Sequence, residues 1–362
     1  MISLYFHVPF CTKKCPYCHF FVVPSAHHEA YLHALEQEWK LIQPLIQDKQ
    51  IVSVYFGGGT PSLLGPAKIE QILSWISCSG EITLEANPDD ITLEKMEAFR
   101  KAGINRVSIG VQSLDNPLLK TLGRLHTAQK AIEAIQMTAA SGITNITIDL
   151  MYELPGQTIS SWENTLSQLE NIPITHLSLY NLTFEPGAVF HKQQKQLSPL
   201  LPPPDESLAM LNSACTFLPT IGLQRYEISA FAKPGFESQH NTGYWTGRPF
   251  LGLGPSAFSY WEGRRFRNVC HLKKWQDLLS QNTLPRDFDE KLSPLASLHE
   301  RLAVRLRLLT GAPRTEFPVD PALLTHLQSK NLITLTGTHI LLTDHGRLFY
   351  DSVAEEIILI SE

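Results

Sequence analysis

Three cysteine side chains near the amino end of the chain have the spacing of a metal-binding loop. In "HVPFCTKKCPYCHF" (residues 7–20), Cys11, Cys15 and Cys18 follow a C-x3-C-x2-C pattern, and Phe20 stands where a fourth thiol could have followed. The other three cysteines are scattered singly. A secreted disulfide scaffold would carry a dense set of paired cysteines. The pattern therefore favours a local metal or redox site, and we expect a cytoplasmic protein.

Four uses of these thiols can be compared from spacing and residue type. A disulfide with one spare thiol fits poorly in a reducing compartment. A structural zinc site needs a fourth ligand, and His19 is adjacent to Cys18 and badly placed to bind the same ion. A redox pair of Cys15 and Cys18 leaves Cys11 unexplained. The spacing favours an iron–sulfur cluster on three cysteines, which leaves one iron open to an exogenous ligand.

Composition excludes several classes of protein. The chain has 362 residues, 43% of them hydrophobic and 18% charged, which is typical of a globular protein of one large and one smaller domain. Its formal net charge of -5 argues against a nucleic-acid partner, since phosphate binding needs a basic surface. No apolar run approaches the roughly 18 residues of a membrane span. The amino-terminal residues also lack the features of a signal peptide.

Short β-rich runs alternate with segments of helical periodicity over the first half of the chain. The expected strands cover residues 3–8, 51–58, 81–87, 104–111, 143–150 and 175–182. The expected helices cover residues 27–47, 66–77, 92–102, 126–141 and 159–170. Gly103 and Gly142 follow two of these helices as left-handed caps would, and Ser160 and Glu163 have capping-box spacing.

This alternation predicts parallel strand–helix–strand units, in a doubly wound sheet or a barrel, open or closed. Periodicity does not choose between these architectures. In each of them the carboxyl ends of the strands form the functional edge. The conspicuous motifs follow strands and should gather at that edge: the cysteines, "GGGTPS" (57–62), "EANP" (85–88), "GVQS" (110–113) and "DLMYELPG" (149–156).

The second half of the chain has a different pattern. The proline-rich stretch 197–206 predicts a loop, and a helix (206–219) and a strand (224–229) follow. We expect three parts: a core over 1–230, a connecting region over 231–289 and a carboxyl-terminal domain over 290–362. The last part predicts helix, two strands and helix, a winged-helix-like α+β unit. Given the charge, structural packing explains it better than DNA binding.

The cysteine spacing, with aromatic Tyr17 before the third cysteine, resembles the signature of the radical S-adenosylmethionine (SAM) superfamily. In that family, SAM binds the open iron and is cleaved by one electron from the cluster. The resemblance implies a [4Fe–4S] cluster on Cys11, Cys15 and Cys18, SAM as second cofactor, and an electron donor as partner. It also implies an α/β fold, a partial (β/α)6 barrel with the cluster loop after the first strand.

Further residues match, in order, positions that contact SAM in that family. The glycine motif would bind the amino group, the carboxylate and amide side chains the ribose hydroxyls, and the arginine the carboxylate. Each alone is as easily structural, but the ordered set is hard to explain otherwise. The residues implied for SAM are Tyr5, Tyr17, Gly58, Gly59, Thr60, Glu85, Gln112, Arg124 and Asp149.

The motifs together resemble the coproporphyrinogen-oxidase-like group over essentially the whole chain. One member, the oxygen-independent coproporphyrinogen III oxidase, is a radical SAM decarboxylase of heme biosynthesis. It carries a fourth cysteine two residues after the third, and a longer segment before the cluster. This sequence has Phe20 at that position and ten residues before Cys11. Both features point away from the oxidase, which stays the alternative.

The other member is the HemW family of heme chaperones, whose marker H-N-x-x-Y-W matches "HNTGYW" (240–245). Outside this resemblance, a His in a Gly-rich loop is more often a hydrogen-bonding residue than a ligand. The resemblance implies heme as ligand, with His240 and Tyr244 as candidate iron ligands. Its partners would be heme-acceptor proteins, some membrane-associated, and the cluster and SAM would support homodimerisation or regulate transfer. His19 and Glu153 depart from the family pattern.

Overall fold

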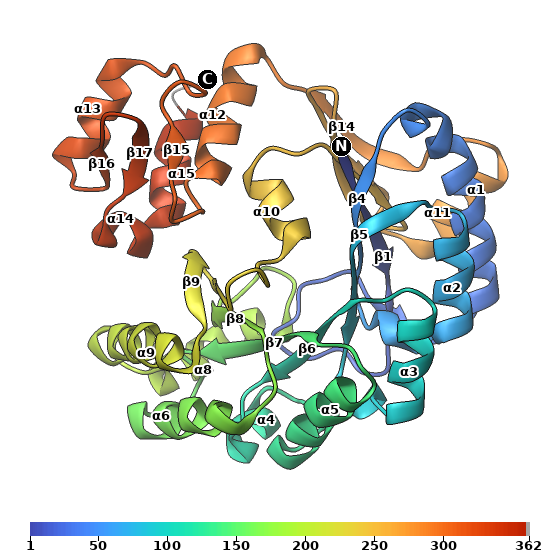
Figure 1. The fold of residues 1–362 in the computed structure, drawn as a ribbon, viewed down its shortest axis with the longest axis horizontal. Coiled ribbons are helices and arrows are strands. Elements are labelled where there is room, and N and C mark those ends of the chain that lie inside the picture. Colours follow the sequence, from blue (N-terminus) through green and yellow to red (C-terminus); the bar gives the residue numbers. More distant parts are fainter. Residues whose placement is uncertain (360–362) are drawn as a thin grey trace.

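Six parallel strands form the centre of a twelve-stranded sheet in the computed structural model, which describes residues 1–359 (Figure 1). They are the six strands expected from the sequence, with bounds shifted by a few residues. In chain order they are β1 (Ile2–Val8), β4 (Ile51–Gly58), β5 (Cys78–Ala86), β6 (Arg106–Gln112), β7 (Asn145–Tyr152) and β8 (His176–Asn181). Each is paired with the next in parallel register, as strand–helix–strand connections require.

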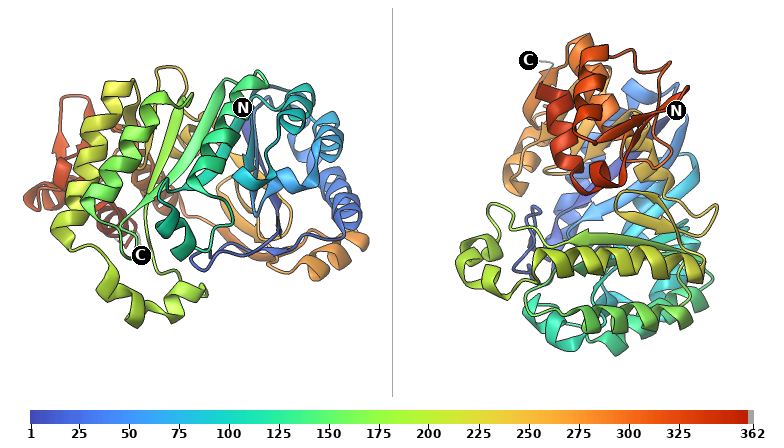
Figure 2. Two further views of the ribbon diagram at one scale, coloured as in Figure 1. Left: turned by 90° about the horizontal axis from the view of Figure 1, so that it is seen from below. Right: turned by 90° about the vertical axis from the view of Figure 1, so that its left-hand side faces the viewer.

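Helices cover the outer face of this sheet, as Figures 1 and 2 show. Most of them bury apolar residues against it in one continuous core, whereas α4 and α7 contribute to a separate apolar cluster. The bounds are α1 (His28–Ile46), α2 (Pro66–Ser74), α3 (Leu93–Lys101), α4 (Asn116–Thr121), α5 (Ala128–Ala140), α6 (Ile159–Ser167), α7 (Val189–Lys192), α8 (Gln194–Leu197) and α9 (Pro204–Phe217). Helix α4 was not expected from the sequence; it has six residues and is capped by Asp115.

The predicted helix ends are only partly right. Gly103 and Gly142 have φ of 111° and 88°, the left-handed conformation expected after a helix. The capping box on Ser160 and Glu163 is wrong. The N-cap of helix α6 is Thr158, two residues before Ser160, so that Thr158 and Ser161 exchange side-chain and backbone hydrogen bonds instead.

Additional strands extend both edges of the parallel core. On one side β11 (Phe250–Leu253) pairs in parallel with β1, and an antiparallel ribbon of β12 (Phe258–Trp261), β13 (Arg264–Asn268) and β14 (Arg286–Lys291) continues the sheet. On the other side β10 (Ala230–Ala232) and β9 (Gln224–Glu227) follow β8. Strands β14 and β9 are the two edges, so the barrel is open. The predicted fold class, a partial (β/α)6 barrel, is confirmed.

The elements from residue 294 onwards form a small α+β unit with its own apolar core, and this confirms the winged-helix-like prediction. Its three-stranded sheet has the order β15-β17-β16. The unit lies at the open side of the barrel near β9 (Figures 1 and 2), where Leu308 bridges to Glu227. Its elements are α12 (Pro294–Arg305), β15 (Ala312–Pro313), α13 (Pro321–Ser329), β16 (Ile333–Leu335), β17 (His339–Leu342), α14 (Asp344–Leu348) and α15 (Tyr350–Leu359). The domain boundaries proposed at 230 and 290 stay predictions.

Two short strands flank the cysteine loop, and one further helix packs on the outside of the sheet. The short strands β2 (Phe10–Cys11) and β3 (Val23–Pro24) pair on either side of the cysteine loop, and α11 (Leu272–Ser280) packs against α1. No helix within residues 1–359 combines the length and hydropathy that a membrane span needs.

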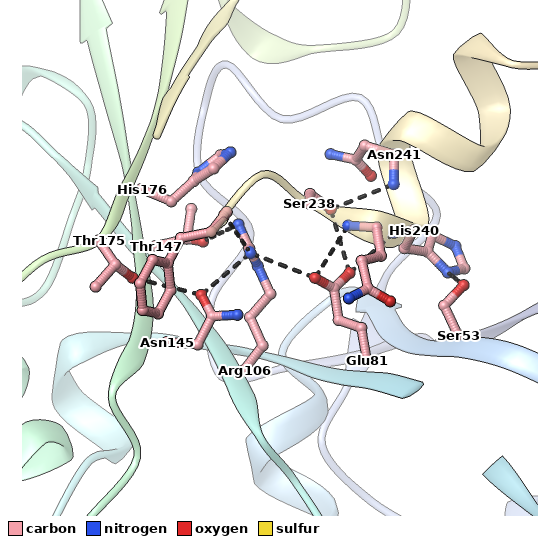
Figure 3. A network of polar contacts seen from close by, with 12 residues as sticks. Ser53, Glu81, Arg106, Asn145, Thr147, Thr175, His176, Ser238, His240 and Asn241 are labelled. Carbon is pink, nitrogen blue, oxygen red and sulfur yellow. Dashed lines mark hydrogen bonds and ion pairs between the residues drawn. The ribbon is translucent and has the colours of Figure 1, made fainter. Parts of the chain in front are cut away.

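Helix α10 (Gln239–Trp245) lies inside the open barrel and is held there by a buried ion pair (Figure 3). The Glu81 carboxylate accepts hydrogen bonds from the backbone N–H groups of Gln239 and His240, at 3.0 and 2.9 Å. It also pairs with Arg106, whose guanidinium is 2% exposed and lies 3.3 Å away. A carboxylate at a helix amino terminus offsets the unpaired N–H groups there. The pair therefore fixes α10 to the starts of β5 and β6.

Replacing Arg106 with Leu should lower the free energy of unfolding by about 3–5 kcal/mol, because Glu81 would stay buried without its counter-ion. Urea denaturation measures the loss. The exposed pair of Arg264 and Asp289 supplies the control, since Arg264→Leu should change stability by no more than about 1 kcal/mol. Equal effects of the two substitutions would contradict this assignment.

Glu153, one of the departures from the family pattern, has a backbone φ of 62°. This left-handed conformation costs a non-glycine residue about 1–2 kcal/mol, so Glu153→Gly should raise stability by about 0.5–1 kcal/mol once the extra freedom of glycine in the unfolded chain is subtracted. Thermal denaturation tests this. Glu97→Gly, within helix α3, should have the opposite sign; a destabilised Glu153→Gly protein would refute the prediction.

Candidate functional site

The cysteine loop lies at the carboxyl edge of the parallel strands, as the sequence predicts. Cys11 is the last residue of β2. The other two cysteines lie in a turn, in which the N–H of Cys18 donates to the carbonyl of Cys15. The glycine turn after β4 anchors the loop, because the N–H of Thr60 donates to the carbonyl of Phe10 at 2.7 Å. All three cysteines line a cavity of about 410 Å³.

The donors in this cavity suit an iron–sulfur cluster better than a single ion. Within residues 1–359, no three His, Cys, Asp or Glu side chains converge closely enough to hold one metal ion. A cluster differs, because each thiolate binds a different iron. Thr60 donates to the sulfur of Cys11 at 3.5 Å and Arg124 to that of Cys15 at 3.6 Å. Both sulfur atoms therefore lie within reach of polar groups that also line this cavity.

Most of the residues implied for SAM share this cavity with the cysteines. They arrive from the ends of different strands, which is the arrangement that the parallel sheet imposes. Tyr5 is the exception: its ring stacks on Tyr55 and lines a different cavity. The predicted residues that line the cysteine cavity are Tyr17, Gly58, Gly59, Thr60, Glu85, Gln112, Arg124 and Asp149.

The glycine turn is needed for packing of the chain itself. A Cβ on Gly58 would lie 2.6 Å from the ring of His7, and one on Gly59 would lie 2.5 Å from the carbonyl oxygen of Phe10. Moreover, the N–H of Gly58 donates to Glu85 and that of Gly59 to Val8. These glycines therefore set the distance between β4 and the cysteine loop, whatever they contact in a ligand.

Two part-buried carboxylates face the cavity, and both have a raised pKa. Burial raises the pKa of Glu85 to about 7, although the Tyr55 hydroxyl (2.8 Å) and the Gly58 N–H (3.1 Å) partly offset this. Burial likewise raises the pKa of Asp149 to about 6, against hydrogen bonds from Ser178 and Ser108. When ionised, carboxylates in such a site accept strong hydrogen bonds from the hydroxyl groups of a sugar.

Arg124 has unused hydrogen-bonding capacity in the cavity. One terminal nitrogen donates to Asn87 at 2.5 Å and to the carbonyl of Gly110 at 2.6 Å, whereas its buried Nε has no partner within residues 1–359. The geometry fits a carboxylate-bearing ligand. Asn87, which also donates to Thr60, was missed at the sequence level. The alternation of side chains along a strand could have revealed it, because Asn87 follows Glu85 by two residues and so faces the same side.

Backbone strain marks one further position in the cavity. Gln112 has a φ of 67° at the end of β6, where the register with β7 shifts. A bulge of this kind redirects a side chain, and strained residues concentrate at ligand sites. The strain therefore supports a binding role for Gln112.

A second, larger cavity of about 950 Å³ adjoins the first. Four residues of the cysteine loop line both cavities: Lys14, His19, Phe20 and Val22. Its lining also includes Tyr5, His7 and Tyr244, and residues of β12, β13 and α12. Phe20, predicted to distinguish two functions, is 51% exposed at this shared wall. The cysteine loop therefore separates two cavities.

His240 lies in helix α10, not in a loop, and is 1% exposed. Its Nδ1 is 3.0 Å from Ser53, which itself donates to Ser3, so Nδ1 carries the proton. Its Nε2 then accepts from the hydroxyl of Tyr244 at 2.7 Å. Burial lowers the pKa of His240 to about 3, so the ring is neutral. Both nitrogens are engaged, and iron ligation by His240 would require this network to open.

Three comparisons with known proteins agree with this geometry. The family model of the radical SAM superfamily matches residues 5–169. The heme chaperone HemW of Bacillus subtilis is 32% identical over 98% of both chains. HemW of Escherichia coli is 32% identical over 98% of this chain and 97% of its own.

A solved structure extends the likeness to the fold. Coproporphyrinogen III oxidase (HemN) from Escherichia coli, described as a radical SAM enzyme, superposes with a TM-score of 0.84 at 26% identity. The match covers 98% of this chain and 89% of that one, so it includes the carboxyl-terminal unit. The chain therefore belongs to the radical SAM superfamily and, within it, to the HemW family.

Proposed function

We propose that the protein is a heme chaperone, which binds heme and passes it to acceptor proteins. The observation that carries this proposal is the near full-length likeness to curated heme chaperones, together with a 950 Å³ cavity beside the cysteine loop. Ligand sites span about 300–1,000 Å³, so a tetrapyrrole suits the cavity. The acceptors include membrane-associated proteins, and the protein acts in the cytoplasm.

In this proposal, Cys11, Cys15 and Cys18 hold a [4Fe–4S] cluster, and SAM occupies the adjoining cavity of about 410 Å³. Glu85 and Asp149 would accept hydrogen bonds from the ribose hydroxyls, and the guanidinium group of Arg124 would bind the carboxylate. When bound and reduced, the cluster supplies an electron. Cluster and SAM support homodimerisation or regulate heme transfer.

The second candidate is the oxygen-independent coproporphyrinogen III oxidase, which the solved HemN structure favours. Its members carry a fourth cysteine two residues after the third. Here that position is Phe20, whose ring lies in the wall between the two cavities. A phenylalanine offers neither a thiolate nor a proton-transfer group. The substitution favours the chaperone.

Anaerobic reconstitution tests the two candidates on one preparation. We expect stoichiometric heme binding, transfer of that heme to an apo-acceptor, and coproporphyrinogen decarboxylation no faster than the protein-free background. Absorbance follows heme, and carbon dioxide release follows the enzyme reaction. Decarboxylation well above background, dependent on SAM and reductant, would establish the oxidase instead.

The cluster ligands can be tested separately. Cys15→Ser should abolish the visible absorbance of the cluster, because a three-thiolate site loses one of its iron ligands. Cys78→Ser, at the start of β5 and away from the cavity, should leave the absorbance unchanged. A cluster of full intensity in the Cys15→Ser protein would show that the ligands are misassigned.

SAM affinity should rise with pH between about 6 and 8. The raised pKa of Glu85, about 7, means that this group is mostly protonated at the lower pH and ionised at the higher one. If the carboxylate accepts the ribose hydroxyls, the dissociation constant should fall by up to about tenfold. Equilibrium dialysis on the reconstituted protein measures it.

The matched substitution is Glu85→Gln, which keeps the shape of the side chain but cannot titrate. Its SAM affinity should be weaker at the higher pH and nearly flat across the range. Glu94→Gln, on the exposed face of α3, should retain the pH dependence of the original protein. The assignment fails if Glu85→Gln follows the same pH curve as the original.

A further inference from the structure

The lining of the larger cavity has an excess of positive charge. Among residues 1–359, five cationic side chains but only one carboxylate, that of Glu300, line it, in a chain whose net charge is -5. Such a bias towards positive charge around a largely apolar cavity indicates an anionic ligand with an apolar body. The cationic residues are Lys14, Arg248, Arg265, Arg267 and Arg301.

Two of these arginines are already neutralised by the protein. Arg265 pairs with Glu290 and Glu300, each at 2.5 Å. Arg267 makes a two-pronged pair with Asp287 at 2.9 and 3.2 Å. These pairs join β13 to β14 and α12, so they brace one wall of the cavity and are not free to bind a ligand.

Arg248 and Arg301 differ, because within residues 1–359 neither has a carboxylate at ion-pair distance. Arg248 donates only to neutral oxygens, Ser3 Oγ at 3.3 Å and the carbonyl of Gln239 at 3.1 Å. Arg301 lies 6.0 Å over the ring of Phe317. Burial lowers the pKa of Arg248, and the charge of Glu81 offsets this only in part.

Arg248 and Arg301 line the same cavity, although they come from different parts of the chain. Gly247, next to Arg248, touches the other one, since a Cβ there would lie 3.4 Å from the Cδ of Arg301. They therefore form one cationic end of the cavity, between the end of α10 and α12. Two guanidinium groups that line one cavity can bind two carboxylates of one ligand.

Much of the remaining lining is aromatic. Phe20 and Phe258 are 51% and 49% exposed, high values for side chains of this size, and both face the cavity. Phe250 packs edge-on against Tyr244, which His240 holds in place through its hydroxyl. Aromatic surfaces of this kind pack against a flat, apolar ring system.

We propose that the larger cavity is the heme site, and that Arg248 and Arg301 bind the two heme propionates. The inference rests on the proposed function, because it takes heme as the ligand, and it adds where heme lies and which groups orient it. The macrocycle contacts the aromatic lining, and Tyr244 forms part of the wall. In this arrangement His240 is a positioning residue, which holds Tyr244 through its Nε2.

The test compares ferric heme with heme dimethyl ester, which has the same macrocycle but no carboxylates. The original protein should bind heme at least about tenfold more tightly than the ester, as expected for charge-assisted contacts. Arg248→Ala and Arg301→Ala should each weaken heme binding about tenfold, and the double variant should no longer discriminate heme from ester. Arg264→Ala removes an arginine of β13 that does not line the cavity, and should bind as the original does.

Each outcome has a distinct meaning. Because the two ligands are compared on one protein, the result is independent of any general loss of stability. Arg248→Lys should discriminate heme from the ester better than Arg248→Ala does. A double variant that still prefers heme, or an original protein that binds the ester equally well, overturns the propionate assignment but leaves the chaperone in place. If the original protein binds neither ligand, the proposed function fails as well.

Discussion

The contact between His7 and Gly58 determines the geometry of both cavities. The His7 ring lies where a Cβ on Gly58 would be, and its Nε2 donates to the carbonyl of Phe21 at 2.9 Å. Burial lowers the pKa of His7 to about 4, so it stays neutral and keeps one tautomer. One side chain thus ties the end of β1 to the end of β4 and to the far side of the cysteine loop. The loop is fixed at both ends before any cofactor binds.

This arrangement explains why one loop can serve two sites. Its cysteines face the smaller cavity, whereas Phe20 and neighbouring residues also form a wall of the larger one. A ligand in either cavity therefore contacts the same segment of chain. In the proposed chaperone, occupancy of the cluster and SAM site would bear directly on the residues that contact heme.

Direct contacts between polar side chains connect the two ends of the barrel interior. At the starts of the strands, Glu81 and Arg106 hold α10 through its backbone. From there, His240 contacts the ring of Tyr55, and Tyr55 donates to Glu85 in the cluster cavity. The H-N-x-x-Y-W motif is therefore joined to the predicted SAM residues by direct contacts. Its residues Tyr244 and Trp245 line the larger cavity, while His240 itself is buried.

The sequence alone determined the local patterns and their order. Strand–helix alternation and cysteine spacing predicted the open α/β barrel and the place of the cysteine loop, because both depend on short-range periodicity and on the rule that parallel strands end at one edge. Eight of the nine residues implied for SAM line one cavity for the same reason. Alternation also carried the signal for Asn87, which was overlooked.

Only the tertiary structure decided which distant residues meet. The enclosure of His240 depends on Ser53, 187 positions away, and the cationic end of the larger cavity joins Arg248 to Arg301 through Gly247. Neither pairing has a periodicity, since it arises from the packing of α10 inside the sheet and of α12 against it. Whether an arginine is neutralised by the protein or left for a ligand is a property of such long-range packing, and no local pattern records it.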